Sequence, residues 1–176
     1  MDTNRKIAIA VGVLYIIGTV AGVLSVVTTN SILGASDYLT KISHHENQMY
    51  LGALFVLIMG LALAVIPAVA YPILKKHNEV LAVGYVIFRG ALETLTYVVV
   101  ILGWLVLVPV SNEYVKASDV STYQAMGKMV IETGDIGATM TAIIFPIGAL
   151  MLYIVFYQSK LTPRWVSVWG LLAVAL

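Results

Sequence analysis

Residues 84–100, GYVIFRGALETLTYVVV, form an apolar run that holds two opposite charges, Arg89 and Glu93, four positions apart. The run extends from about residue 81 to residue 108. A hydrocarbon core of about 30 Å is crossed by about 20 apolar residues of helix. Because lipid offers no hydrogen-bond partner to free backbone groups, such a run predicts a membrane-spanning helix.

The whole chain has the composition of a multi-pass membrane protein. Of its 176 residues, 60% are hydrophobic and 11% are charged, whereas soluble domains average about 45–50% apolar and about 25% charged. The net charge of +1 provides no electrostatic attraction for nucleic acid, which is not expected as a partner. The chain has no cysteine, which excludes thiolate metal sites and cysteine nucleophiles.

Five apolar stretches divide the chain. They cover approximately residues 7–27, 48–74, 81–108 and 134–157, and the fifth begins at Trp165. The first four are long enough to cross a bilayer, so the predicted fold class is all-α, a polytopic transmembrane helical bundle. The fifth ends at Leu176, too soon to cross. We therefore expect one membrane domain over residues 1–176, continuing with at least one further span.

Lysine and arginine in the loops predict the orientation of the chain, because these residues collect on the cytoplasmic side. A cytoplasmic amino terminus places Arg5, Lys6, Lys75, Lys76, Lys160 and Arg164 inside, and Lys41, Lys116 and Lys128 outside. The inner side holds the larger number. We expect a cytoplasmic amino terminus and a multi-pass location in the plasma (inner) membrane.

Polar residues of the third span fall on one stripe. At about 100° per residue, Tyr85, Arg89, Glu93 and Thr96 share a helix face. Counted from Leu81, Arg89 lies about 12 Å and Glu93 about 18 Å along the axis, both inside the hydrocarbon zone. Ionisable residues at such depth usually face a cavity, pair with each other and mark functional paths.

A second polar stripe opens the fourth span. It comprises Gln124, Lys128, Glu132, Asp135 and Thr139, and predicts one long helix over about residues 122–157, beginning at a capping box in STYQ, 121–124. His44 and His45 begin the second span on the same outer side. A protonatable path could lead from these histidines past Glu132 and Asp135 to Glu93. The alternatives are a structural clasp between Arg89 and Glu93 and a solvated loop at the histidines.

Signatures of catalysis are absent from the sequence. It contains no H-E-x-x-H, G-x-S-x-G, P-loop or G-x-G-x-x-G pattern. His77 lies on the inner side, opposite the other two histidines, which excludes a three-histidine metal site under this topology. We predict no catalytic residue, metal site or cofactor. Whether the protein is an enzyme stays open, and the missing signatures favour a protein that is not one.

Four stretches carry a resemblance to a known family. They are RKIAIAVGVLYIIGTVAGVLS (5–25), AYPILKKHN (70–78), FRGALE (88–93) and YQSKLTPRWVSVWGLL (157–172). Together they resemble an uncharacterised family of small bacterial multi-pass membrane proteins, classed as domain of unknown function 4386. The resemblance implies a helical membrane domain with a further span and places Arg89 and Glu93 in the family's R-x-x-x-E pattern. It supplies no activity.

The leading functional hypothesis is a polar pocket between the helices that binds or moves a small molecule, a lipid headgroup or a proton. Tyr85, Arg89 and Glu93 would form its buried part, and the outer carboxylates and histidines its mouth. One alternative is an intramembrane enzyme acting on a lipid or a small apolar substrate. Another is a structural or accessory subunit held by an Arg–Glu clasp. The expected partners are the lipid bilayer and a small-molecule or lipid ligand, and oligomerisation stays open.

Overall fold

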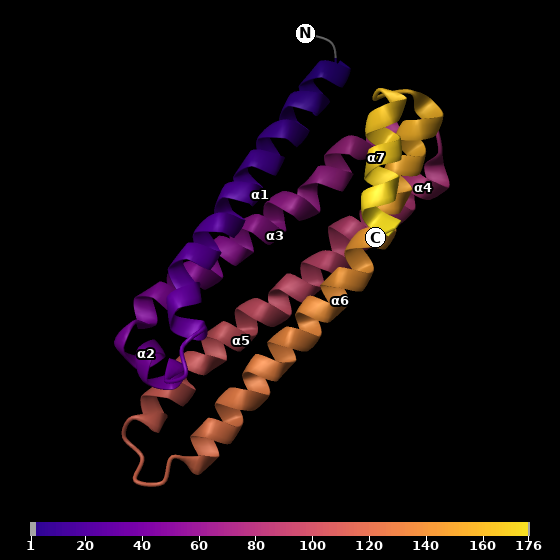
Figure 1. Ribbon diagram of the computed structural model, residues 1–176. Coiled ribbons are helices and arrows are strands. Elements are labelled where there is room, and N and C mark those ends of the chain that lie inside the picture. The colour runs from indigo at the N-terminus through magenta and orange to yellow at the C-terminus, as the bar shows by residue number, and fades with distance from the viewer. Residues whose placement is uncertain (1–2, 176) are drawn as a thin grey trace. The chain divides into compact units, whose positions relative to one another are not determined.

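A computed structural model describes residues 3–175, and these form helices and no strand (Figure 1). Four helical segments are long and apolar enough to cross a membrane: Thr3–Leu33, Glu46–Leu74, Glu79–Tyr114 and Ser121–Ser159. They are α1, α3, a composite third segment and α6. A shorter apolar helix, α7, covers Arg164–Ala175. The predicted all-α fold with four spans is confirmed.

The third span is composite. It consists of α4 (Glu79–Tyr85), η1 (Val86–Leu92) and α5 (Glu93–Tyr114). The middle piece, η1, is a π-helix, in which each amide bonds to the carbonyl five residues earlier. Sequence periodicity predicted one continuous helix here, and the single wide turn was not foreseen.

A short helix, α2 (Tyr38–His44), lies in the connection between the first two spans. The sequence analysis treated this region as a loop. Leu39 and Ile42 are buried and pack with Ile32, Met49 and Leu107. Seven residues are too few to show a helical repeat, so α2 is formed by its tertiary contacts.

The chain divides into two units, each described by itself. Unit 1 consists of the residues up to Ile17, Leu61–Leu95 and the residues from Met140 onward. Unit 2 consists of Gly18–Gly60 and Thr96–Thr139. Each long helix therefore contributes one part to each unit.

Unit 2 is assembled by close approach at glycines. Gly52 of α3 faces Thr29 of α1 and Trp104 of α5, and a β-carbon at residue 52 would overlap the Thr29 methyl group. A β-carbon at Gly22 of α1 would lie 2.9 Å from the Met59 sulfur on α3. Small residues let membrane helices approach closely, so glycines hold α1 to α3 here.

In unit 1, Leu74, Ala82, Tyr85 and Val155 form a buried apolar cluster. Leu74 is on α3, Ala82 and Tyr85 are on α4, and Val155 is on α6. The cluster therefore joins α3, α4 and α6 beside the charged pair of the third span.

We expect Gly52→Ala to lower the free energy of unfolding by about 1–3 kcal/mol, because the added methyl group must displace Thr29 from a packed three-helix contact. Thermal unfolding in detergent measures the change. Gly12→Ala is the matched control, since a β-carbon at residue 12 meets nothing within 4 Å. Equal stability of the two variants would contradict this packing.

The α5–α6 connection is fixed by a side chain. The Ser121 amide, at the start of α6, donates a 2.9 Å hydrogen bond to Asp119 Oδ1. This bond holds the pKa of the Asp119 carboxyl below its usual range. The sequence analysis had assigned the start of this helix to a capping box within residues 121–124.

The Asp119 contact makes the start of α6 sensitive to acid. A lowered carboxyl pKa contributes stability that is complete above the unfolded-state pKa and is lost as pH falls through the folded-state pKa. We expect hydrogen exchange of the Ser121 amide, corrected for its intrinsic pH dependence, to lose protection at acidic pH. Asp119→Asn should show low protection at every pH, and unchanged protection in this variant would contradict the assignment.

Candidate functional site

The charged pair predicted in the third span forms a direct contact. Arg89 Nη1 donates hydrogen bonds to both carboxylate oxygens of Glu93. The side chain of Arg89 is 10% exposed and that of Glu93 is 1% exposed. Two opposite charges at this depth are tolerated because each compensates the other, whereas a lone buried charge would be strongly destabilising.

A π-turn places the two charged side chains. Arg89 lies within η1, and the amide of Glu93 donates to the carbonyl of Phe88 five residues earlier. Two glycines let the neighbouring helices approach this turn. A β-carbon at Gly90 would lie 3.3 Å from the Ala64 carbonyl of α3, and one at Gly148 of α6 would lie 3.2 Å from the Arg89 amide nitrogen. Single π-turns occur frequently at functional sites.

Aromatic side chains complete the surroundings of the pair. The Arg89 guanidinium carbon lies 4.6 Å from the centre of the Phe145 ring, within range of a cation–π interaction. Tyr85 is 2% exposed, and its hydroxyl lies near that of Tyr15 on α1. Phe145 and Tyr15 come from helices other than the third span, and the sequence analysis assigned neither.

The predicted polar stripe of the third span is buried along its whole length. Tyr85, Arg89, Glu93 and Thr96 are 2%, 9%, 1% and 5% exposed. Four residues of an α-helix rotate the chain by more than one full turn. A π-turn holds more residues per turn, so it reduces this excess rotation. The spacing therefore keeps Tyr85, Arg89 and Glu93 on one face despite the change of helix type.

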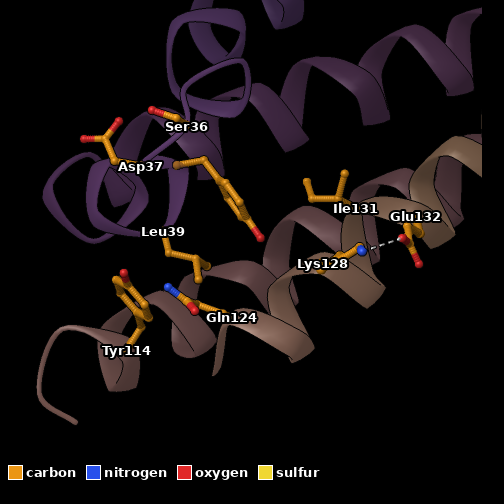
Figure 2. Close-up of a pocket in the computed structure, with 9 residues that line it drawn as sticks. Ser36, Asp37, Leu39, Tyr114, Gln124, Lys128, Ile131 and Glu132 are labelled. Carbon is orange, nitrogen blue, oxygen red and sulfur yellow. Dashed lines mark ion pairs between the residues drawn. The ribbon is translucent and has the colours of Figure 1, made fainter. Parts of the chain in front are cut away.

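Unit 2 contains a polar cavity of about 440 Å³ (Figure 2). This polar pocket is lined by Ser36, Asp37, Tyr38, Leu39, Tyr114, Gln124, Lys128, Ile131 and Glu132. Figure 2 shows Ser36 and Asp37 at the beginning of α2, Tyr114 at the end of α5, and Gln124, Lys128 and Glu132 along α6. The pocket therefore gathers the connections that follow the first and third spans.

Two interactions define the electrostatics of the polar pocket. Lys128 Nζ lies 3.8 Å from Glu132 Oε1, with both side chains exposed. Partial burial and the nearby Tyr114 raise the pKa of Tyr38, so its hydroxyl stays protonated at neutral pH. At one end of the pocket, Lys128, Glu132 and Tyr38 thus supply a cation, a carboxylate and an aromatic hydroxyl group (Figure 2).

A second cavity, of about 400 Å³, adjoins the polar pocket at Ile131, which lines both. This apolar groove is lined by Leu33, Gly34, Val100, Gly103, Trp104, Leu107, Val130, Ile131, Gly134, Asp135 and Ala138. Asp135 is its only charged lining residue, and its side chain is exposed.

The predicted outer histidines occupy a different hollow. Ser43, His44, His45, Glu46, Asn47 and Gln48 surround a surface cavity of about 430 Å³. Both histidines are exposed, and Glu46 accepts a 2.8 Å hydrogen bond from Asn112. Within residues 3–175 no group of three histidine, cysteine or acidic side chains could hold a metal ion.

The predicted site residues thus fall into three groups. Tyr85, Arg89 and Glu93 lie together in unit 1. Glu132 and Asp135 line the two adjoining cavities of unit 2, while His44 and His45 line the third. The proposed path from the histidines to Glu93 stays a prediction. Tyr38, Tyr114 and Trp104 were missed, because the cavities combine segments far apart in sequence.

Coupling between Arg89 and Glu93 can be measured with apolar substitutions. We expect Arg89→Met or Glu93→Met alone to cost about 3–5 kcal/mol, because each leaves one charge buried without its partner. The double variant should recover most of that loss. The matched control is the exposed pair Lys128 and Glu132, with the same spacing, whose coupling should be about 0–1 kcal/mol. Additive losses at Arg89 and Glu93 would contradict a compensated pair.

Comparison with protein-family models matches residues 10–176 to the family described as Domain of unknown function (DUF4386). The match covers both the charged pair and the two adjoining cavities. Comparisons with curated proteins and with solved structures gave no match.

Proposed function

The chain belongs to the DUF4386 family, and from this premise we propose an integral membrane protein that binds or moves a proton or small polar ligand at Arg89 and Glu93. The plasma membrane of a bacterium, with the amino terminus in the cytoplasm, is the proposed location. One observation carries the proposal: a buried, mutually bonded Arg–Glu pair lies at a π-turn within a membrane span.

Partner exchange is the chemistry that this pair supports. Guanidinium groups bind carboxylates and phosphates through N–H groups of the kind that hold Glu93 in the pair. A proton on Glu93 removes its negative charge, and a ligand anion can then take its place beside Arg89. Exchange in this order never leaves an uncompensated carboxylate in the hydrocarbon zone.

A structural clasp is the second candidate, and the same geometry gives it a specific support. Both oxygens of Glu93 accept hydrogen bonds from Arg89, and the Glu93 side chain is 1% exposed. In a clasp the pair holds η1 between its neighbours and exchanges neither proton nor ligand. The two candidates differ in whether Glu93 changes its charge while the protein stays folded.

Infrared difference spectroscopy of the protein in lipid nanodiscs separates them. We expect acidification to produce the high-frequency stretch of a protonated carboxyl in an apolar site, separate from the band of the exposed carboxyls, and this stretch should disappear when the pH is returned to neutral. The band should be missing in Glu93→Gln and retained in Glu113→Gln, an exposed carboxylate at the end of α5. Near-ultraviolet circular dichroism, recorded in parallel, should show intact tertiary structure.

A Glu93 that stays ionised until the tertiary signal is lost would refute the exchange site and leave the clasp. The same spectra also address an anionic ligand. Added phosphate or a short carboxylate should increase the protonated band in the wild type, because an anion beside Arg89 favours the neutral form of Glu93.

A further inference from the structure

We propose that the polar pocket and the apolar groove of unit 2 form one binding site for a membrane amphiphile. The head of this ligand carries a phosphate and an ammonium group, as in phosphatidylethanolamine, and its alkyl chain occupies the groove. The inference is independent of the Arg89–Glu93 site, since it rests on other residues.

A lining residue shared by the two cavities carries the first step. Ile131 lines both the polar pocket and the apolar groove, with volumes of about 440 and 400 Å³. On α6, the pocket is lined by residues from Gln124 to Glu132 and the groove by residues from Val130 to Ala138. A ligand that fills both must be polar at one end and apolar at the other.

The position of α6 in a bilayer matches this division. Its 39 residues extend about 58 Å at 1.5 Å per residue, well beyond a hydrocarbon core of about 30 Å. The apolar part of this helix starts near Gly134. The polar pocket therefore lies at headgroup level, and the groove begins where the acyl chains begin.

The head chemistry follows from the lining of the polar pocket. Lys128 supplies a cation for a phosphate, and its exposed contact with Glu132 at 3.8 Å is weak enough to yield. Glu132, beside Lys128, offers its carboxylate to the neighbouring ammonium group, and Tyr38 adds an aromatic face. Both parts of a zwitterionic head thus find complementary groups.

The apolar groove has room for a chain because small residues line it. Gly103 and Gly134 stand on α5 and α6, and a β-carbon at Gly134 would meet nothing within 4 Å. Trp104 and Leu107 provide apolar surface. Trp104 also supplies a fluorescent reporter inside the proposed chain site.

The experiment measures quenching of Trp104 by phosphatidylethanolamine brominated on its acyl chain. Trp165→Phe and Trp169→Phe remove the other two tryptophans, which are both 74% exposed. The full chain is kept in dodecyl maltoside, and the brominated lipid is added at low mole fraction. We expect saturable quenching, which non-brominated phosphatidylethanolamine reverses by competition.

Filling the groove tests the chain site. We expect Gly134→Leu to abolish saturable quenching, because the added side chain occupies the open space of the groove. Gly12→Leu is the matched control, since residue 12 also has open space but lines neither cavity. Thermal unfolding of both variants verifies that they fold.

Charge substitutions test the head site. Lys128→Gln should weaken binding about tenfold. Lys116→Gln is the control, because Lys116 lies in the α5–α6 connection outside the pocket, and this variant should bind the lipid unchanged. Phosphatidylethanolamine should bind about fivefold more tightly than phosphatidylglycerol, which lacks the ammonium group. Glu132→Gln should remove that preference.

Three results would each overturn the proposal. Quenching that survives Gly134→Leu, or is lost equally in Gly12→Leu, would show that the groove holds no chain. Equal binding of the two lipids, unaffected by Glu132→Gln, would contradict the zwitterionic head site. Displacement of the lipid by soluble phosphoethanolamine at equal concentration would indicate a free headgroup compound as the ligand, and not an amphiphile.

Discussion

A guanidinium and a carboxylate remain charged among apolar side chains only when each neutralises the other, and Arg89 and Glu93 meet that condition within unit 1. Their contact explains several neighbouring features. The π-turn sets the backbone that carries both side chains, and Gly148 allows α6 to approach the Arg89 backbone. Phe145 covers the guanidinium. Loss of either charge would leave these features around an uncompensated ion.

The two candidate sites differ in how they avoid the free-energy cost of burying polar groups in a membrane protein. The buried pair satisfies its charges internally, so any ligand must replace an existing partner. Lys128 and Glu132 of the polar pocket are exposed, so the proposed ligand would enter without displacing a buried ion. Exchange at the pair therefore requires a change of protonation, whereas binding at the pocket requires only complementary shape and charge.

The features that could be predicted from the sequence are those that depend on composition and on the local spacing of polar residues along a helix. Four spans follow from long apolar runs, and the burial of Tyr85, Arg89, Glu93 and Thr96 follows from their spacing. The π-turn and α2 could not be predicted, because both depend on packing between distant segments and neither leaves a repeat in the sequence. For the same reason the polar pocket escaped detection, since it joins Tyr38, Tyr114 and Lys128 across three elements.

The central claim is that Arg89 and Glu93 form a compensated pair when the protein lies in a bilayer. Solid-state NMR measures this directly through the dipolar coupling between ¹⁵N-labelled Arg89 Nη and ¹³C-labelled Glu93 Cδ in lipid. The account predicts a strong coupling, as expected for hydrogen-bonded groups, together with slow polarisation transfer from water. Absence of the coupling, or rapid transfer from water to both side chains, would contradict it.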